Sequence, residues 1–477
     1  MIIKKKNNNI MHSKSVNIYF LCILFVVISV FVSLNAFNNR PETGIYKFVY
    51  FLPLFFAVFS ILFFKVYTNI TVVSGMILAF MFIRYTVSVL MLTMDGFPKG
   101  IYAITYNEEY VTEALYLMIY EMLILFIGLL IISKKKQPLI TEEIYANRLL
   151  TKTNFSKLNL LIVFLIIITF GMFLVWPALF KNYSFIINSS LDSMTSDLIR
   201  SQSGMPSGMR WIGYTCGEAV RNILVEFIVL WCYKRYVVNG KSRYWYLSLL
   251  SVCVNALITT SRLMVGLFTA IVFIEQIYYL YPKKRKVLIN VGAILGSILV
   301  IAVALTYLSN AMVYQARSQL IQGYTNGYYN VYQSLCAYSN ASQTFFDKVE
   351  MFFLGDGLGN VNVLSMFING TNSSDLYNNY IYGFSFNGGA VVPLISQSSY
   401  YLSPILAPIV SFLCVLGAKK YEIKWKRAEG NILVNGIMSI TLAAIPFMYN
   451  WSTLIHILTI VIIPIWFCYK INSRIRT

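Results

Sequence analysis

The chain has 477 residues and a formal net charge of +19 at pH 7, with 58% hydrophobic and only 12% charged residues. A soluble domain has about 25% charged residues, so this composition excludes an ordinary soluble protein. Repeated apolar runs of about 20 residues, each long enough to cross a hydrocarbon core of about 30 Å, indicate an all-α polytopic membrane protein.

In chain order, the apolar runs predict twelve transmembrane helices in one integral membrane domain, residues 1–477. They lie near residues 17–37, 46–64, 70–94, 113–133, 158–176, 211–232, 244–260, 262–281, 287–308, 391–417, 431–449 and 453–470. The first run is long and lacks a small-residue cleavage site, which favours a membrane anchor over a signal peptide.

The basic residues predict how the chain is oriented in the membrane. Basic clusters at both termini and after alternate apolar runs place 27 of the 38 lysines and arginines on one side, with only four of the 19 acidic residues. Cytoplasmic loops carry such an excess, so we expect both termini to be cytoplasmic. The high net charge then indicates contact with anionic membrane lipids, and we expect no nucleic-acid partner.

The ninth and tenth runs are separated by a long segment, residues 309–390, on the side predicted to be external. It is too apolar and aromatic for a disordered linker. We expect short amphipathic helices that cap the bundle, and a structured loop of this length is usually functional.

Arginine dominates the basic residues away from the cytoplasmic side. These arginines are Arg40, Arg84, Arg200, Arg210, Arg221, Arg262 and Arg317. A guanidinium group presents a fork of donors that suits phosphate, so several arginines converging on one external cavity would bind a pyrophosphate-linked lipid. The alternative is that each reaches the interface or pairs with a nearby acid.

Glu218 and Arg221 are three residues apart in a predicted transmembrane helix and therefore share one face. A structural ion pair is the simplest interpretation. The alternatives are that Glu218 orients Arg221 for a ligand or acts as a base. Glu226, further along the helix, is expected to be satisfied by its packing.

Three further segments contain candidate substrate contacts. Gln315 and Arg317 precede a tyrosine-rich stretch that suits either a saccharide or an interfacial aromatic belt, and Asp356 lies in the glycine-rich stretch "FFLGDGLGN". Gln397, Tyr400 and Tyr401 lie in the polar patch "SQSSYY" at the entry to the tenth predicted helix, where Pro393 and Pro404 predict a broken helix. No arrangement of His, Cys, Asp and Glu suggests a metal site, and we expect no cofactor.

Three of these motifs in this order, "TTSRLM", "FFLGDGLGN" and "VVPLISQSSYYLSPILAPI", resemble the bacterial O-antigen or oligosaccharide repeat-unit polymerases. The resemblance extends over the whole chain and implies a GT-C-like membrane glycosyltransferase with its large external loop between helices 9 and 10. It would act on the external face of the bacterial cytoplasmic membrane, and a chain-length regulator protein is a possible partner.

The reaction that the resemblance implies is block transfer of a glycan from one undecaprenyl pyrophosphate carrier to a lipid-linked repeat unit. Arg262 would bind the leaving pyrophosphate. Arg317, inferred from its external position alone, and Glu218, as a possible base beside Arg221, complete the expected catalytic set. The remaining expected substrate contacts are Arg200, Arg210, Arg221, Gln315, Asp356, Gln397, Tyr400 and Tyr401.

Two other functions fit the same sequence. A flippase for lipid-linked oligosaccharides would have a similar length, but it predicts short external loops, related halves and charges along a central path. An O-antigen ligase uses the same donor with a different acceptor, and the sequence barely separates it from a polymerase.

Overall fold

The regular structure in the computed structural model is entirely helical over the residues that it describes, which include no strand. The described residues are 7–67, 70–97, 107–133, 142–152, 160–175, 207–257, 263–290, 327–339, 344–350, 352–353 and 394–474.

Several of these helices are suited to a bilayer. Four are long and apolar enough to cross a membrane, namely Tyr19–Asn39, Val72–Met94, Glu108–Ile131 and Trp451–Ile471. A fifth is added if Val265–Leu280 and Pro282–Asn290, which meet at 107°, form one bent span. The chain is thus a helical membrane protein, as its composition predicts.

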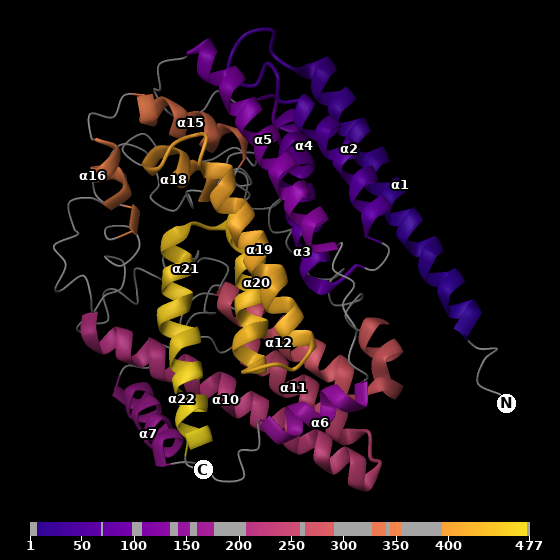
Figure 1. Cartoon of the computed structure of the whole chain (residues 1–477), viewed down its shortest axis with the longest axis vertical. Coiled ribbons are helices and arrows are strands. Elements are labelled where there is room, and N and C mark those ends of the chain that lie inside the picture. Colours follow the sequence, from indigo (N-terminus) through magenta and orange to yellow (C-terminus); the bar gives the residue numbers. More distant parts are fainter. Residues whose placement is uncertain are drawn as a thin grey trace.

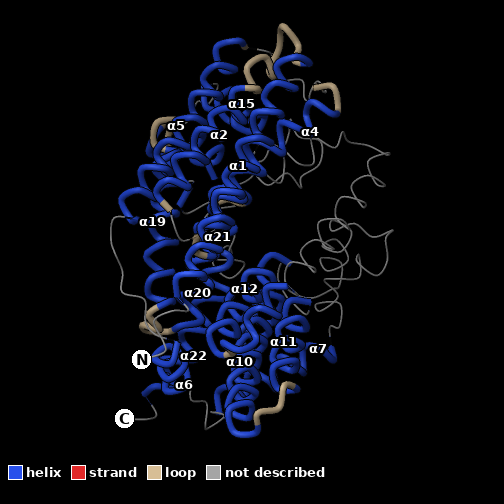
Figure 2. The backbone as a smooth tube through the Cα atoms, turned by 90° about the vertical axis from the view of Figure 1, so that its right-hand side faces the viewer, coloured by secondary structure: helices blue, strands red, loops and turns tan. Residues whose placement is uncertain are grey.

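The N-terminal helices form the upper part of the molecule in Figures 1 and 2. They are α1 (Asn7–Asn39), α2 (Phe51–Val66), α3 (Val72–Phe82), α4 (Ser88–Met94) and α5 (Glu108–Ser133). The π-helical turn η1 (Ile83–Val87) joins α3 to α4 within one continuous helix. Such turns widen a helix locally and are frequent at functional sites.

A second group of helices lies at the lower end of the molecule (Figure 1). It comprises α6 (Glu142–Lys152), α7 (Leu160–Val175), α10 (Ser207–Asn239), α11 (Arg243–Leu257), α12 (Leu263–Leu280) and the short η3 (Pro282–Lys284). Helices α10, α11 and α12 pack on one another in chain order, while α7 lies against α10 and α6 against α12.

The C-terminal helices connect the two groups. They are α15 (Tyr328–Ser339), α16 (Phe345–Glu350), α18 (Leu394–Tyr401), α19 (Ala407–Lys426), α20 (Ile432–Met448), α21 (Trp451–Ile457), η7 (Leu458–Ile462) and α22 (Ile463–Arg474). Helix α15 packs against α5 and α18 at the upper end, whereas α22 packs against α10 near the lower end.

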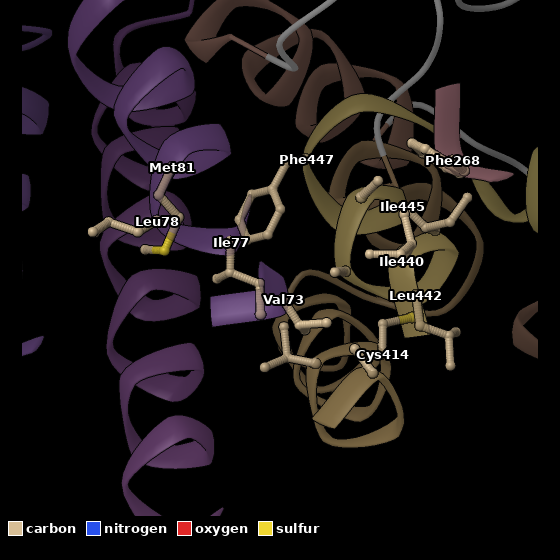
Figure 3. Close-up of a cluster of buried hydrophobic side chains, with 14 of the residues drawn as sticks. Val73, Ile77, Leu78, Met81, Phe268, Cys414, Ile440, Leu442, Ile445 and Phe447 are labelled. Atoms are coloured by element: carbon tan, nitrogen blue, oxygen red, sulfur yellow. The ribbon is translucent and has the colours of Figure 1, made fainter. Parts of the chain in front are cut away.

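The α19–α20 hairpin holds the centre of the core. Figure 3 shows Ile77 and Met81 of α3 facing Phe447 of α20, and all three side chains are fully buried. Gly436 of α20 allows a close approach to α12, because a Cβ there would lie 2.6 Å from Val272 Cγ1. Apolar helices far apart in the chain therefore build one continuous core.

The helix break predicted around Pro404 is confirmed. Helix α18 ends at Tyr401 and α19 begins at Ala407, with Pro404 in the connection. The break frees α18 from the line of α19, so that α18 contacts α15, α16 and α20 as well.

Candidate functional site

The predicted site residues divide into two sets. Arg200, Arg262, Gln315, Arg317 and Asp356 lie outside the described residues. Arg210 lies in α10, but its side chain is also outside the described part. The structure therefore bears on Glu218, Arg221, Gln397, Tyr400 and Tyr401.

Glu218 and Arg221 form an ion pair inside the protein. The Glu218 side chain is fully buried and that of Arg221 is 9% exposed, and Arg221 Nη2 donates to Glu218 Oε2. The second terminal nitrogen, Nη1, donates to the backbone carbonyl of Asn255 in the last turn of α11. Carbonyls at the end of a helix have no partner within the helix, so Arg221 caps α11 while Glu218 fixes its guanidinium.

This pair belongs to a polar cluster of three helices. Asn222 Nδ2 donates to the Glu218 carbonyl at 2.8 Å. The side-chain amide of Asn255 lies 3.5 Å from both Asn222 Oδ1 and Thr269 Oγ1, which joins α10 to α11 and α12. Sequence reasoning missed Asn222, Asn255 and Thr269. Two of them could have been found in the sequence, because an amide side chain is unusual on an apolar helix. Asn222 lies four residues after Glu218, and Asn255 lies seven residues before Arg262.

The cluster involves the two helices that flank Arg262 in the sequence. Asn255 of α11 precedes Arg262 by seven residues, and Thr269 of α12 follows it by seven. Arg221 and the Asn255 amide therefore tie α10, α11 and α12 together on either side of Arg262 in the sequence.

Helix α18 is a second polar element, and every one of its residues is buried. Gln397 Oε1 accepts a hydrogen bond of 2.8 Å from the backbone N–H of Trp451, at the first residue of α21. Leu394 N–H donates to the Tyr449 carbonyl at 2.9 Å. The hydroxyls of Ser396 and Ser398 have no hydrogen-bond partner within the described structure. Gln397 thus anchors α18 to α21.

Aromatic rings and one lysine surround α18. The buried Lys348 of α16 places Nζ 4.3 Å from the Tyr338 ring centroid and 5.5 Å from that of Tyr400. Burial lowers the pKa of Lys348. Phe352 stacks on Trp451 at 5.3 Å, and its centroid lies 5.9 Å from that of Tyr401. Cations over aromatic faces and stacked rings are features that bind sugars and charged head groups.

Tyr449 connects α18 to α12. Its ring lies edge-on to Phe268 of α12 with centroids 6.5 Å apart, and its carbonyl accepts the bond from Leu394. Phe268 is in the second turn of α12, close to the end that follows Arg262 in the sequence. Tyr449 therefore links the first part of α12 to the start of α18.

A second ion pair is buried between α5 and η1. Arg84 Nη1 lies 3.0 Å from Glu121 Oε2, and both side chains are fully buried. Tyr85 and Ser411 donate to the Glu121 carboxylate at 3.1 and 2.6 Å, and Arg84 also donates to the Pro446 carbonyl at 3.3 Å. The alternative that an arginine pairs with an acid therefore holds for Arg84. No sequence pattern singles out Glu121.

The ligand sets of metal sites combine several His, Cys, Asp or Glu side chains. No group of three or more such side chains in the described part of the chain has a geometry that could hold a metal ion. The polar groups that do converge are cations, amides, hydroxyls and paired carboxylates, which suit an anionic or sugar ligand.

These features define a helical membrane protein that gathers paired charges and amides inside its bundle. No family model, no curated protein and no solved structure matches the chain.

Proposed function

We propose that this protein is a membrane glycosyltransferase that polymerises undecaprenyl-pyrophosphate-linked oligosaccharide repeat units into O-antigen or capsular polysaccharide. It would have twelve spans, a GT-C-like architecture and both termini in the cytoplasm of the host bacterium. Its active face would be the external face of the cytoplasmic (inner) membrane.

One observation carries the proposal. Tyr449 contacts Phe268 of α12, the helix that follows Arg262 in the sequence, and binds Leu394 of α18, which lies in the third motif of the resemblance. A site that held a lipid pyrophosphate before α12 and a sugar at α18 would need these two helices to be close together.

In the proposed reaction, the acceptor hydroxyl oxygen attacks the anomeric carbon of the donor glycan. The bond from that carbon to the pyrophosphate oxygen breaks, and the lipid pyrophosphate leaves with the bonding electrons. The proton of the acceptor hydroxyl passes to water. Arg262 and Arg317 would stabilise the negative charge that develops on the leaving group. Arg221, anchored by Glu218, would act on this step by holding the end of α11 in position.

On the acceptor side, the ring faces of Tyr400, Tyr401 and Trp451 would pack against sugar C–H faces. The hydroxyls of Ser396 and Ser398, which have no partner in the described structure, would bind sugar hydroxyls. Gln397 would hold α18, which contains these tyrosines and serines, in position through its hydrogen bond to α21.

The flippase remains the second candidate, because the Arg84–Glu121 pair and Glu226 are ionisable groups buried within the bundle. Charged groups inside a membrane bundle often line a transport path.

Glycan profiling of a deletion strain separates the candidates. Single repeat units on the surface anchor would support a polymerase. Full-length polymer retained on its lipid carrier would indicate a ligase, and lipid-linked single units held in the cytoplasm would indicate a flippase.

Complementation then tests the residues. Arg262→Ala and Arg262→Lys should both shorten the polymer, because neither side chain offers the guanidinium fork. Arg243→Ala, at the opposite end of α11, is the matched control and should restore full length. Wild-type polymer length in both Arg262 variants would contradict the leaving-group role.

A further inference from the structure

Helices α10, α11 and α12 each contain buried polar side chains, and Asn255 of α11 joins those of α10 to those of α12. We call this set the polar file: Glu218, Asn222 and Glu226 of α10, Ser248 and Asn255 of α11, and Thr269 and Gln276 of α12. None is more than 2% exposed. Spacings of four residues on α10 and of seven on α11 and α12 keep each set on one face of its helix.

Several polar atoms of the file have no hydrogen-bond partner in the described part of the protein. They are Asn255 Oδ1, Gln276 Oε1 and Nε2, and Glu226 Oε1. Buried polar atoms are almost always satisfied, and where protein groups do not reach them, internal water does. The file therefore has the composition of a hydrated path inside the helix bundle.

Glu226 is the acid at the inner end of the file. Its side chain is fully buried, and Oε2 accepts a hydrogen bond from the Tyr469 hydroxyl of α22. The buried ion pairs of the described residues involve Glu121, Glu218, Glu275 and Glu422, and none involves Glu226. An ionised carboxylate without a cation is expensive at membrane depth, whereas a protonated one is not.

Two titratable groups lie close to Glu226. Tyr469 of α22 binds its carboxylate, and Tyr145 of α6 lies close enough to be affected by its charge. The helices α11 and α12, which pack on α10, contain the titratable groups Arg243, Tyr244, Tyr246, Cys253, Glu275, Tyr278 and Tyr279. Helices α7 and η7, which also pack on α10, contain no titratable side chain. Lys426 lies 3.7 Å from Glu275 and 3.4 Å from Glu422.

Tyr145 shows that the two acids share one environment. Burial first, and then the nearby Glu275, Tyr279 and Glu226 groups, raise the pKa of Tyr145 well above its ordinary value. Its ring packs against Tyr279 with centroids 4.8 Å apart. Glu226 and Glu275 thus both lie near Tyr145.

We propose that Glu226 is a proton-binding site, which takes up a proton from water held along the polar file and returns it by the same route. The carboxylate oxygen forms one O–H bond as a water molecule loses one, and the charge left on the water passes along the hydrated file to bulk solvent. Tyr469 stays a hydrogen-bond donor in both states. This site goes beyond polymer synthesis and does not depend on it.

Infrared difference spectroscopy of the full-length protein in lipid nanodiscs tests the proposal. At neutral pH the wild type should show a protonated-carboxyl C=O band that shifts in D2O, disappears in Glu226→Gln and is lost in alkaline buffer. Glu108→Gln, which alters an exposed acid, is the control and should leave this band intact. The proposal is overturned if wild type and Glu226→Gln give the same band, or if the band neither exchanges in D2O nor titrates.

Tyr469→Phe keeps the test decisive if Glu226→Gln fails to fold. Removing the tyrosine hydroxyl should raise the frequency of the band, because the carboxyl loses a hydrogen-bond donor. An unchanged frequency would equally overturn the assignment to Glu226.

Discussion

The Arg84–Glu121 pair gives the sharpest test of the structure. Glu121→Gln keeps the shape of the side chain but removes its charge, while Arg84, Tyr85 and Ser411 still present donors to it. The variant would leave a fully buried guanidinium without an anion. Removing one partner of a buried pair costs about 3–5 kcal/mol.

The free energy of unfolding, measured by titration with SDS in mixed micelles, reports this cost. A loss of about 3 kcal/mol or more is at least about a hundredfold in the ratio of folded to unfolded protein. Glu108→Gln is the matched control, because the Lys47–Glu108 pair is just as close, at 3.1 Å, but the Glu108 side chain is 65% exposed. An exposed pair contributes only about 0–1 kcal/mol.

The double variant Arg84→Met/Glu121→Met completes the design. Replacing both charges by apolar side chains removes the unpaired charge, so most of the lost stability should return. Two results would contradict this account of the buried pair. One is that Glu121→Gln lowers the free energy of unfolding no more than Glu108→Gln does, and the other is that the double variant is as unstable as Glu121→Gln.

Three further predictions concern the rest of the bundle. Gly436→Ala places a methyl group 2.6 Å from Val272 Cγ1 and should lower the free energy of unfolding by about 1–3 kcal/mol, whereas Gly171→Ala, with no atom within 4 Å, should not. The Glu422 carboxyl lies beyond the predicted span; burial raises its pKa, but Lys419 and Lys426 outweigh burial and hold the pKa below its ordinary value. Its contribution to stability should thus be complete above about pH 5 and be lost as the pH falls further, and Glu422→Gln should flatten this acid dependence in SDS titrations. Arg221→Lys keeps a charge beside Glu218 but cannot bind both partners, so we expect near-normal membrane levels with shorter surface polymer on gels, and wild-type polymer would contradict this.

The hydrophobic pattern predicted the positions of several helices, but it did not predict which helices pack against one another. The run at 70–94 appears as Val72–Met94, and the run at 453–470 lies within Trp451–Ile471. Helix α10 continues to Asn239, beyond the predicted end at 232, because a helix does not have to stop where its apolar run stops. The packing of α3 on α20 has no sequence signal, since any apolar face can meet any other.

In the candidate site, only contacts between residues close together in the sequence were predictable. Three-residue spacing places Glu218 beside Arg221, and the structure has that pair. The second partner of Arg221 is a backbone carbonyl, which any residue could supply, so the sequence does not reveal it. The pairing of Arg84 with Glu121 likewise depends on how α5 meets η1.

The hydrogen bonds of the α19–α20 hairpin also constrain how the protein is made. Ser411 reaches Glu121 across 290 positions of the sequence, and Lys419 reaches Thr71 across 348. The ribosome releases the N-terminal helices into the membrane long before these partners exist. Until α19 is translated, the Glu121 carboxylate lacks one of its donors, and in that state of the nascent chain a membrane insertase or chaperone would have to shield it.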